Sequence, residues 1–258
     1  MYQKCDPQAQ LRLFCFPYAG GGALLFRDWH AELPTSVEVY PVQLPGRGNR
    51  MRERPFTNLS GLVEAAAAEL LPYFDKPFAF FGHSMGAMIC FELTRLLRRI
   101  NGPLPCHLFV SGSRAPQLPD PHPPSYNLPE PEFLQRLREM KGTPAAVFDN
   151  PELRQLVLPL VRADFSVCQT YVYLEEPPLD VPLTAYGGLN DKDVSIDFLE
   201  LWRRQTNGPF MIRLLPGDHF FLNTASQYFF QVLSQDLTTT LRDFASRSSH
   251  SRRASARY

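Results

Sequence analysis

The sequence lacks an excess of charge of either sign. Its 26 Lys and Arg residues balance 26 Asp and Glu residues, so the formal net charge of the 258-residue chain is zero. Proteins that bind nucleic acid or an anionic membrane through their overall field carry a surplus of cationic side chains. We therefore expect neither nucleic acid nor a membrane surface as a partner of this protein.

Long apolar runs are also absent. No stretch reaches the roughly 20 apolar residues that a membrane-spanning helix needs, and Met1–Asp6 contains no apolar signal region. A secreted protein carries such a region at its N-terminus. We therefore expect the protein to be cytoplasmic.

No group of residues has the spacing of a metal site or a phosphate loop. The five cysteines are irregularly spaced, and the sequence has no His-x-x-x-His pair. The run Gly20–Gly22 lacks the Lys-Ser/Thr ending of a phosphate-binding loop. These absences predict buried, reduced thiols, no metal and no other cofactor.

The most informative pattern present is Gly-His-Ser-Met-Gly at residues 82–86. It stands between an apolar run of strand length, 77–81, and a helical pattern over 87–93. This arrangement is typical of the nucleophile elbow of α/β-hydrolases, whose sharp turn holds the serine hydroxyl above the sheet edge. The two glycines leave room for the turn, because a Cβ there would clash with the neighbouring strand or helix. The pattern predicts Ser84 as a nucleophile at a helix N-terminus, where free N–H groups suit an oxyanion.

Strand and helix patterns alternate along most of the chain. The expected strands are 11–16, 37–42, 78–81, 108–111, 183–186 and 210–215, and the expected helices are 59–74, 85–99, 196–204 and 225–245. This alternation predicts an α/β fold with a mostly parallel, doubly wound sheet. The length fits one domain over about residues 1–245.

The alternation is interrupted between about residues 115 and 180. A proline-rich stretch there leads into two helical patterns, over 130–140 and 151–173. We interpret this segment as a helical lid insertion between the two core segments, at about 10–114 and 181–245. The polar tail, residues 246–258, contains four arginines and no acid, and we expect it to be disordered.

A serine nucleophile needs a base and a group that orients the base. In α/β-hydrolases an acid and then a histidine follow the serine, each after a later strand. Of the six histidines, His219 fits this order, because it lies just past the last expected strand. Asp191 and Asp193 both follow the preceding strand. We favour Asp191 and interpret Asp193 as a capping residue of the next helix.

Two backbone N–H groups should stabilise the oxyanion. One belongs to Met85, directly after the nucleophile, and the other should come from the loop after the first strand. Within that loop, residues 18–21, we choose Ala19. Each such donor typically contributes a factor of about 10² to 10³ in rate.

Six segments of the chain form a combination that is specific to one family. They are Phe-Cys-Phe-Pro-Tyr-Ala-Gly-Gly at 14–21, Gln-Leu-Pro-Gly-Arg at 43–47, Phe-Phe-Gly-His-Ser-Met-Gly-Ala at 80–87, Gly-Asp-His-Phe-Phe-Leu at 217–222, and, in the insertion, 141–144 and 160–165. Together they resemble the type II thioesterases of nonribosomal peptide and polyketide synthesis, and the medium-chain thioesterase of animal fatty acid synthase. The similarity extends from about residue 11 to residue 244. The family often has proline after the catalytic acid, where this chain has Lys192, so the choice between Asp191 and Asp193 stays open.

The resemblance implies an α/β-hydrolase fold with a lid and the activity of a stand-alone editing thioesterase. Such an enzyme hydrolyses acyl thioesters on the phosphopantetheine arm of acyl or peptidyl carrier proteins, through an acyl-serine intermediate. The catalytic set carries over onto Ser84, Asp191 and His219. Arg47, in a matched motif, is a candidate contact to the carrier protein or the pantetheine phosphate.

Three alternatives stay open from the sequence. They are a general acyl-CoA or ester hydrolase, an acyltransferase on small molecules, and a binding partner of a synthase without activity. The fold alone does not separate them, because one fold hosts many chemistries. We expect a monomer in each case.

Overall fold

A single parallel sheet forms the centre of the computed structural model, which describes residues 8–255 and the side chains of residues 8–246. Its strand order is β2-β1-β3-β4-β5-β6, and every neighbouring pair is parallel. The strands are β1 (Leu11–Phe16), β2 (Val37–Pro41), β3 (Phe78–His83), β4 (Leu108–Ser111), β5 (Leu183–Gly188) and β6 (Phe210–Leu215). The prediction of a mostly parallel, doubly wound sheet is confirmed.

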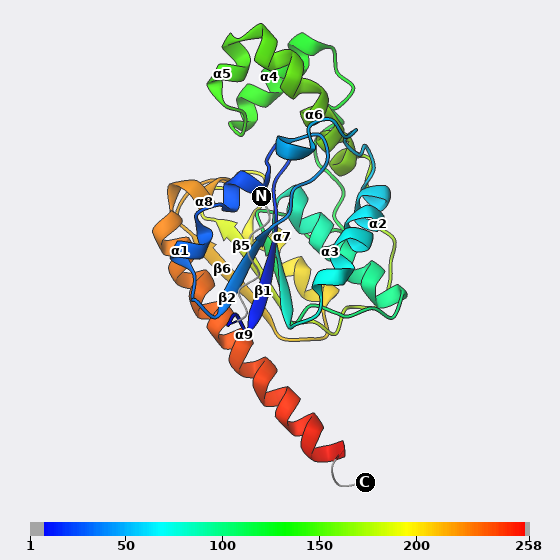
Figure 1. Ribbon diagram of the computed structural model, residues 1–258. Coiled ribbons are helices and arrows are strands. Elements are labelled where there is room, and N and C mark those ends of the chain that lie inside the picture. Colours follow the sequence, from blue (N-terminus) through cyan, green and yellow to red (C-terminus); the bar gives the residue numbers. More distant parts are fainter. Residues whose placement is uncertain (1–7, 256–258) are drawn as a thin grey trace.

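Helices cover both faces of the sheet, as Figure 1 shows. Alternate side chains of β1 point to opposite faces, and each face carries its own apolar cluster. One cluster joins the strands to α2 (Leu59–Leu70), α3 (Met85–Arg99) and α7 (Ile196–Glu200). The other joins them to α1 (Trp29–Glu32), α8 (Phe221–Thr224) and α9 (Ser226–Ser255). Burial on both faces explains why the strands read as continuous apolar runs rather than alternating ones.

The ends of four helices differ from the sequence-based expectation. The helices expected over 59–74 and 196–204 end at Leu70 and Glu200, and each is followed by a short 3-10 helix. The helix expected over 151–173 ends at Gln169, and the one expected over 225–245 continues to Ser255. The side chains of residues 247–255 and the whole of residues 256–258 lie outside what the structure describes. The disordered basic tail therefore stays a prediction.

Three helices lie between β4 and β5 in the sequence and above the carboxyl ends of the strands in space (Figure 1). They are α4 (Glu130–Met140), α5 (Ala145–Asp149) and α6 (Pro151–Gln169), and we call residues 130–169 the cap. The cap has a small apolar cluster of its own, against which Ala19 of the loop after β1 packs. The cluster consists of Phe133, Leu134, Leu137, Leu158, Val161 and Phe165.

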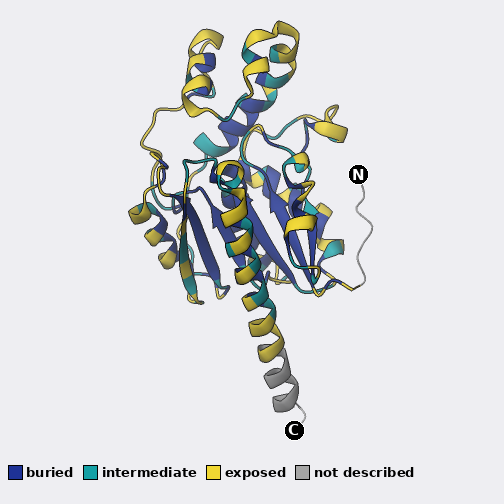
Figure 2. Ribbon diagram, turned by 90° about the vertical axis from the view of Figure 1, so that its left-hand side faces the viewer, coloured by how far each residue is buried: buried dark blue, intermediate teal, exposed yellow. Residues whose placement is uncertain are grey.

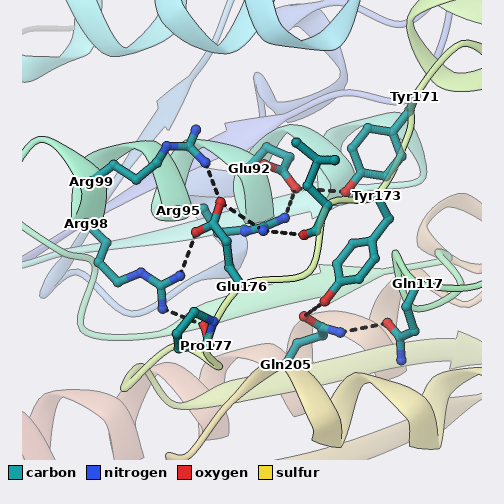
Figure 3. A network of polar contacts seen from close by, with 11 residues as sticks. Glu92, Arg95, Arg98, Arg99, Gln117, Tyr171, Tyr173, Glu176, Pro177 and Gln205 are labelled. Carbon is teal, nitrogen blue, oxygen red and sulfur yellow. Dashed lines mark hydrogen bonds and ion pairs between the residues drawn. The ribbon is translucent and has the colours of Figure 1, made fainter.

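Residues 170–178, which we call the strap, return the chain from α6 towards β5 along helix α3. The strap is fastened by charged groups, as Figure 3 shows. The Tyr171 hydroxyl donates to Glu92 at 2.7 Å, and Glu176 of the strap pairs with three arginines of α3. These arginines are Arg95, Arg98 and Arg99, at distances of 2.9, 2.8 and 2.6 Å.

Candidate active site

Ser84 joins β3 to α3 in a backbone conformation that residues with a side chain rarely adopt. Its φ is 55° and its ψ is −115°. The Ser84 N–H donates to the Ser111 carbonyl at 2.7 Å, and the Ser84 carbonyl accepts from the Ala87 N–H at 2.9 Å. Such strain, of order 1–3 kcal/mol, persists only where the surrounding structure enforces it, and it concentrates at functional sites.

The glycines on either side of Ser84 are required by close backbone contacts. A Cβ on Gly82 would lie 2.1 Å from the Gly86 carbonyl oxygen, and a Cβ on Gly86 would lie 2.2 Å from the carbonyl oxygen of Phe16. No side chain fits at either distance. The elbow therefore has the geometry that its sequence predicts.

His219 follows β6 and Asp191 follows β5, so both lie at the same edge of the sheet as Ser84. The His219 Nδ1 is 2.8 Å from Asp191 Oδ2. The other carboxylate oxygen accepts hydrogen bonds from the backbone N–H groups of Asp193 at 2.9 Å and Val194 at 3.2 Å. The Asp191 side chain is only 1% exposed. These bonds fix the carboxylate, which in turn orients the imidazole so that its Nε2 can exchange a proton with a nucleophile.

Asp193, the alternative acid, lies differently. Its side chain is 55% exposed and lies 3.2 Å from His122 Nε2, and it makes no contact with His219 among the residues described. Of the two acids that the sequence leaves open, the structure joins only Asp191 to the histidine. The expectation that Asp193 caps the next helix is wrong, because Ser195 is the N-cap of α7 and its hydroxyl accepts from the Phe198 N–H.

His83 lies beneath the histidine of this pair. Its ring is fully buried, with Nδ1 2.9 Å from Ser111 Oγ and its centroid 5.1 Å from that of His219. Burial, together with the nearby His219, lowers the pKa of His83 well below its ordinary value, so the ring is neutral at physiological pH. Because His83 precedes Ser84, this contact also places His219 beside the elbow. The sequence favours His219 as the base and did not predict this supporting position of His83.

The loop after β1 lies against the first turn of α3. The close approach of Gly86 to the carbonyl oxygens of Phe16 and Pro17 shows this packing. Met85 is the first residue of α3, where backbone N–H groups have no partner within the helix. Ala19, in the loop, makes no backbone N–H hydrogen bond within the described part of the chain. Neither N–H group has a backbone partner in the described part of the chain, and that of Met85 directly follows Ser84.

Arg47 does not lie where the sequence-based interpretation expects it. Its side chain is 7% exposed and forms a two-bond ion pair with Asp164, with Nη1–Oδ2 at 2.9 Å and Nη2–Oδ1 at 2.7 Å. Nη1 also donates to the Gly21 carbonyl at 2.7 Å. A guanidinium buried in such a pair does not present its charge to a docking protein. The predicted contact with a carrier or a phosphate is therefore replaced by an internal one.

Asp164 is the residue that the sequence-based reasoning missed. It lies in a segment that matches the family, 160–165, yet its partner is 117 residues away in the chain, and no local pattern signals such a pair. Burial raises the pKa of its carboxyl, while Arg47 and the Gly20 N–H act in the opposite direction.

Neither a metal centre nor a membrane span is found in the described part of the chain. No group of three or more His, Cys, Asp or Glu side chains there could hold a metal ion. None of the helices described has the length and apolar character that crossing a bilayer requires.

The chain is similar to proteins of antibiotic biosynthesis. The gramicidin S biosynthesis protein GrsT of Aneurinibacillus migulanus is 47% identical over 90% of this chain and 91% of its own. A Brevibacillus parabrevis protein named linear gramicidin dehydrogenase LgrE is 45% identical over 92% of each chain.

Solved structures show the same relationship. RedJ, a thioesterase of the prodiginine pathway in Streptomyces coelicolor, superposes with a TM-score of 0.83 at 41% identity, covering 88% of this chain and 90% of that chain. YbtT, a type II thioesterase of the yersiniabactin pathway, superposes with a TM-score of 0.81 at 28% identity, covering 93% of this chain and 97% of that chain.

A family model described as a thioesterase domain matches residues 11–239. This match covers all six strands and the cap. The family description agrees with the serine elbow and the histidine–carboxylate pair. It does not agree with the word dehydrogenase in the name of LgrE. The protein is therefore a member of the thioesterase domain family, related to the type II thioesterases of nonribosomal peptide and polyketide synthesis, and a hydrolase acting on thioester bonds.

Proposed function

We propose that this protein is a stand-alone editing thioesterase. Its substrates are acyl groups held as thioesters on the phosphopantetheine arm of carrier proteins, in cytoplasmic nonribosomal peptide or polyketide synthesis. The observation that supports this most is the 2.8 Å contact between His219 and Asp191 beside the elbow of Ser84, in a chain whose relatives include GrsT and RedJ. No cofactor takes part in the proposed reaction.

In the first half of the reaction, Ser84 Oγ attacks the carbonyl carbon of the thioester. His219 Nε2 accepts the proton of the hydroxyl, and Asp191 stabilises the imidazolium that forms. The N–H groups of Met85 and Ala19 stabilise the negative oxygen of the tetrahedral intermediate. The C–S bond then breaks, which leaves an acyl-Ser84 ester and the pantetheine thiolate. A thiolate leaves without prior protonation, so His219 acts chiefly as a base. The released thiolate then takes the proton from the His219 imidazolium, which gives a free thiol and a neutral imidazole that can act as a base again.

In the second half, His219 takes a proton from a water molecule, which attacks the acyl carbon. The same two N–H groups stabilise the second tetrahedral intermediate. The bond to Ser84 Oγ breaks, the serine recovers its proton from His219, and the acyl group leaves as a carboxylic acid. The carrier protein regains a free thiol and can be loaded again.

The cap supports this function as a lid over the acyl group. Two glycines show how closely the cap lies against the site. A Cβ on Gly20, in the loop after β1, would lie 3.3 Å from Val161 of the cap. A Cβ on Gly142, in the cap, would lie 2.6 Å from the ring of Phe220, the residue after His219. Phe133 and Leu137, which are buried within the cap, provide its apolar interior. An apolar cover limits the entry of water into the site, apart from the one molecule that attacks the acyl carbon.

The test is to present one acyl group in three forms: on a phosphopantetheinylated carrier protein, on coenzyme A and on a phenol. We expect kcat/KM to be highest for the carrier protein. Ser84→Ala should abolish turnover without lowering the melting temperature, and wild type should show a transient mass increase of one acyl group. Equal turnover of the three forms would identify a general hydrolase instead. Acyl transfer to an added alcohol or amine in preference to water would identify an acyltransferase.

A further inference from the structure

One buried carboxylate, Asp164 of α6, connects the cap to the loop after β1. Its Oδ2 accepts the backbone N–H of Gly20 at 2.7 Å. Both of its oxygens bind Arg47, whose Nη1 also donates to the Gly21 carbonyl. The loop is thus held on two successive residues, at an N–H group by Asp164 itself and at a carbonyl through Arg47.

The residues held in this way adjoin Ala19, the loop residue whose N–H makes no backbone hydrogen bond in the described part of the chain. Gly20 has a φ of +80°, a conformation that directs the peptide on its N-terminal side and that glycine adopts readily. The bond from its N–H to Asp164 fixes the plane of the peptide between Ala19 and Gly20, which directly follows the peptide that carries the Ala19 N–H. Ala19 itself packs against the apolar cluster of the cap. The cap thus holds both Ala19 itself and the peptide that follows the Ala19 N–H.

We propose that Asp164 is a positioning residue for the oxyanion hole, holding the Ala19 N–H toward the thioester oxygen through Gly20 and Arg47. This inference rests on the proposed function of Ser84. Asp164 touches neither the nucleophile nor the histidine, so it acts only through the loop. Because it belongs to α6, the hole is complete only while this helix is seated on the loop. Displacement of α6 would remove both bonds and disable the N–H donor at the same time.

The substitution Asp164→Asn tests this role. It keeps an oxygen that can accept the Gly20 N–H but removes the charge that holds Arg47. We expect kcat for the carrier-bound acyl group to fall by about 10²-fold, the effect of losing one oxyanion donor, with KM changed less than threefold. Arg47→Lys keeps the charge but loses the two-bond geometry, and it should show a smaller fall in the same direction.

The matched control is Glu38→Gln. Glu38 forms a buried ion pair with Arg12 at 3.0 Å, at the amino end of the strands and far from the elbow. The control therefore reports what the loss of a buried ion pair does to stability alone. We expect its melting temperature to fall as that of Asp164→Asn does, with kcat unchanged.

A second readout separates positioning from general destabilisation. An acyl trifluoromethyl ketone forms a tetrahedral adduct with serine, whose oxyanion occupies the proposed hole. Its inhibition constant should rise in Asp164→Asn and Arg47→Lys by the factor by which kcat/KM falls, and should not change in Glu38→Gln. If Asp164→Asn cannot be obtained folded, Arg47→Lys alone provides the correlation.

Unchanged kcat and inhibitor affinity in a folded Asp164 or Arg47 variant would overturn the inference while leaving the proposed function intact. The same would follow if the two quantities changed only as much as in Glu38→Gln. Failure of wild type to hydrolyse any acyl thioester would overturn the proposed function, and the inference with it.

Discussion

The elbow and the cap meet at the same edge of the sheet but are held by different forces. Around Ser84, backbone lies against backbone so closely that no Cβ fits at Gly82 or Gly86. The cap has a separate apolar cluster of six buried side chains, and Figure 2 shows that much of its surface is exposed. Among its exposed side chains is Leu156, at 57%. The cap is joined to the core by the polar links of Asp164 and of the strap, and by Val167 near the end of α6, which belongs to an apolar cluster of the sheet. Ser84 thus lies in a closely packed region, whereas α4 and the first part of α6 pack mainly within the cap itself.

The largest effect should come from adding one carbon to the elbow. Gly86→Ala places a Cβ 2.2 Å from the Phe16 carbonyl oxygen, and neither backbone can move without separating α3 from β1. We expect the loss to approach the whole free energy of folding, about 5–15 kcal/mol. Urea denaturation and soluble yield measure this effect.

Gly102→Ala is the control, since its Cβ would lie 3.4 Å from its nearest neighbour, Leu97, at an ordinary contact distance. We expect this control to differ from wild type by less than about 1 kcal/mol. Similar stabilities of Gly86→Ala and Gly102→Ala would show that the backbone of the elbow can move to accommodate a Cβ, and that its packing is not as close as proposed.

The next effect concerns the acid of the site and should leave the fold intact. Asp191→Asn preserves the shape of the side chain but removes the charge that holds the imidazole tautomer. We expect kcat to fall by about 10⁴-fold, as for other triads. Asp193→Asn, two residues away, should change kcat by less than about threefold, because its contact with His122 is exposed. Steady-state kinetics on a single acyl substrate measures kcat for both variants. A larger fall in kcat for Asp193→Asn than for Asp191→Asn would identify Asp193 as the orienting acid.

A third experiment compares the two regions directly by removing one fully buried ring from each. Phe80→Ala, in β3, should lower the free energy of global unfolding by about 3–5 kcal/mol. Phe133→Ala, in the cap, should lower it by less than about 1 kcal/mol, because the cap can open locally while the sheet stays folded. Hydrogen exchange should show faster exchange over α4 in the second variant and not in the first. Equal losses of global stability would mean that cap and sheet unfold as one unit.

The smallest effect is a pH dependence that arises from His83. Burial lowers its pKa in the folded state, whereas the unfolded chain has the ordinary value of about 6.5. The unfolded state therefore binds more protons as the pH falls below about 6.5. Stability is lost in that range, at up to about 1.4 kcal/mol per pH unit.

His83→Asn should remove this share of the pH dependence. Urea unfolding of wild type and variant between pH 5 and pH 8 should give curves that separate by a constant amount above pH 7 and converge below it. Curves that stay parallel down to pH 5 would show that His83 is protonated in the folded state as readily as in the unfolded chain.

Much of the sheet edge around Ser84 could be predicted, because its structure depends on short sequence patterns. The elbow needs a strand, two glycines and a helix within a few residues, and each of these has a local signal. The order of Ser84, Asp191 and His219 follows from the order of the strands, since parallel strands end at one edge of the sheet. The fold class, the elbow at Ser84 and the contact between His219 and Asp191 were therefore accessible from the sequence together.

What the sequence by itself determined is the backbone geometry of the elbow and the succession of strands and helices, because both depend on interactions between near neighbours in the chain. Only the tertiary structure decided that Asp191 rather than Asp193 meets His219, since both follow the same strand and only packing turns one of them inward. It also decided that Arg47 is an internal tie to Asp164. The sequence around an arginine does not show whether its side chain is exposed to solvent or paired with a carboxylate. For Arg47 the pairing depends on packing against α6, which is distant in the chain.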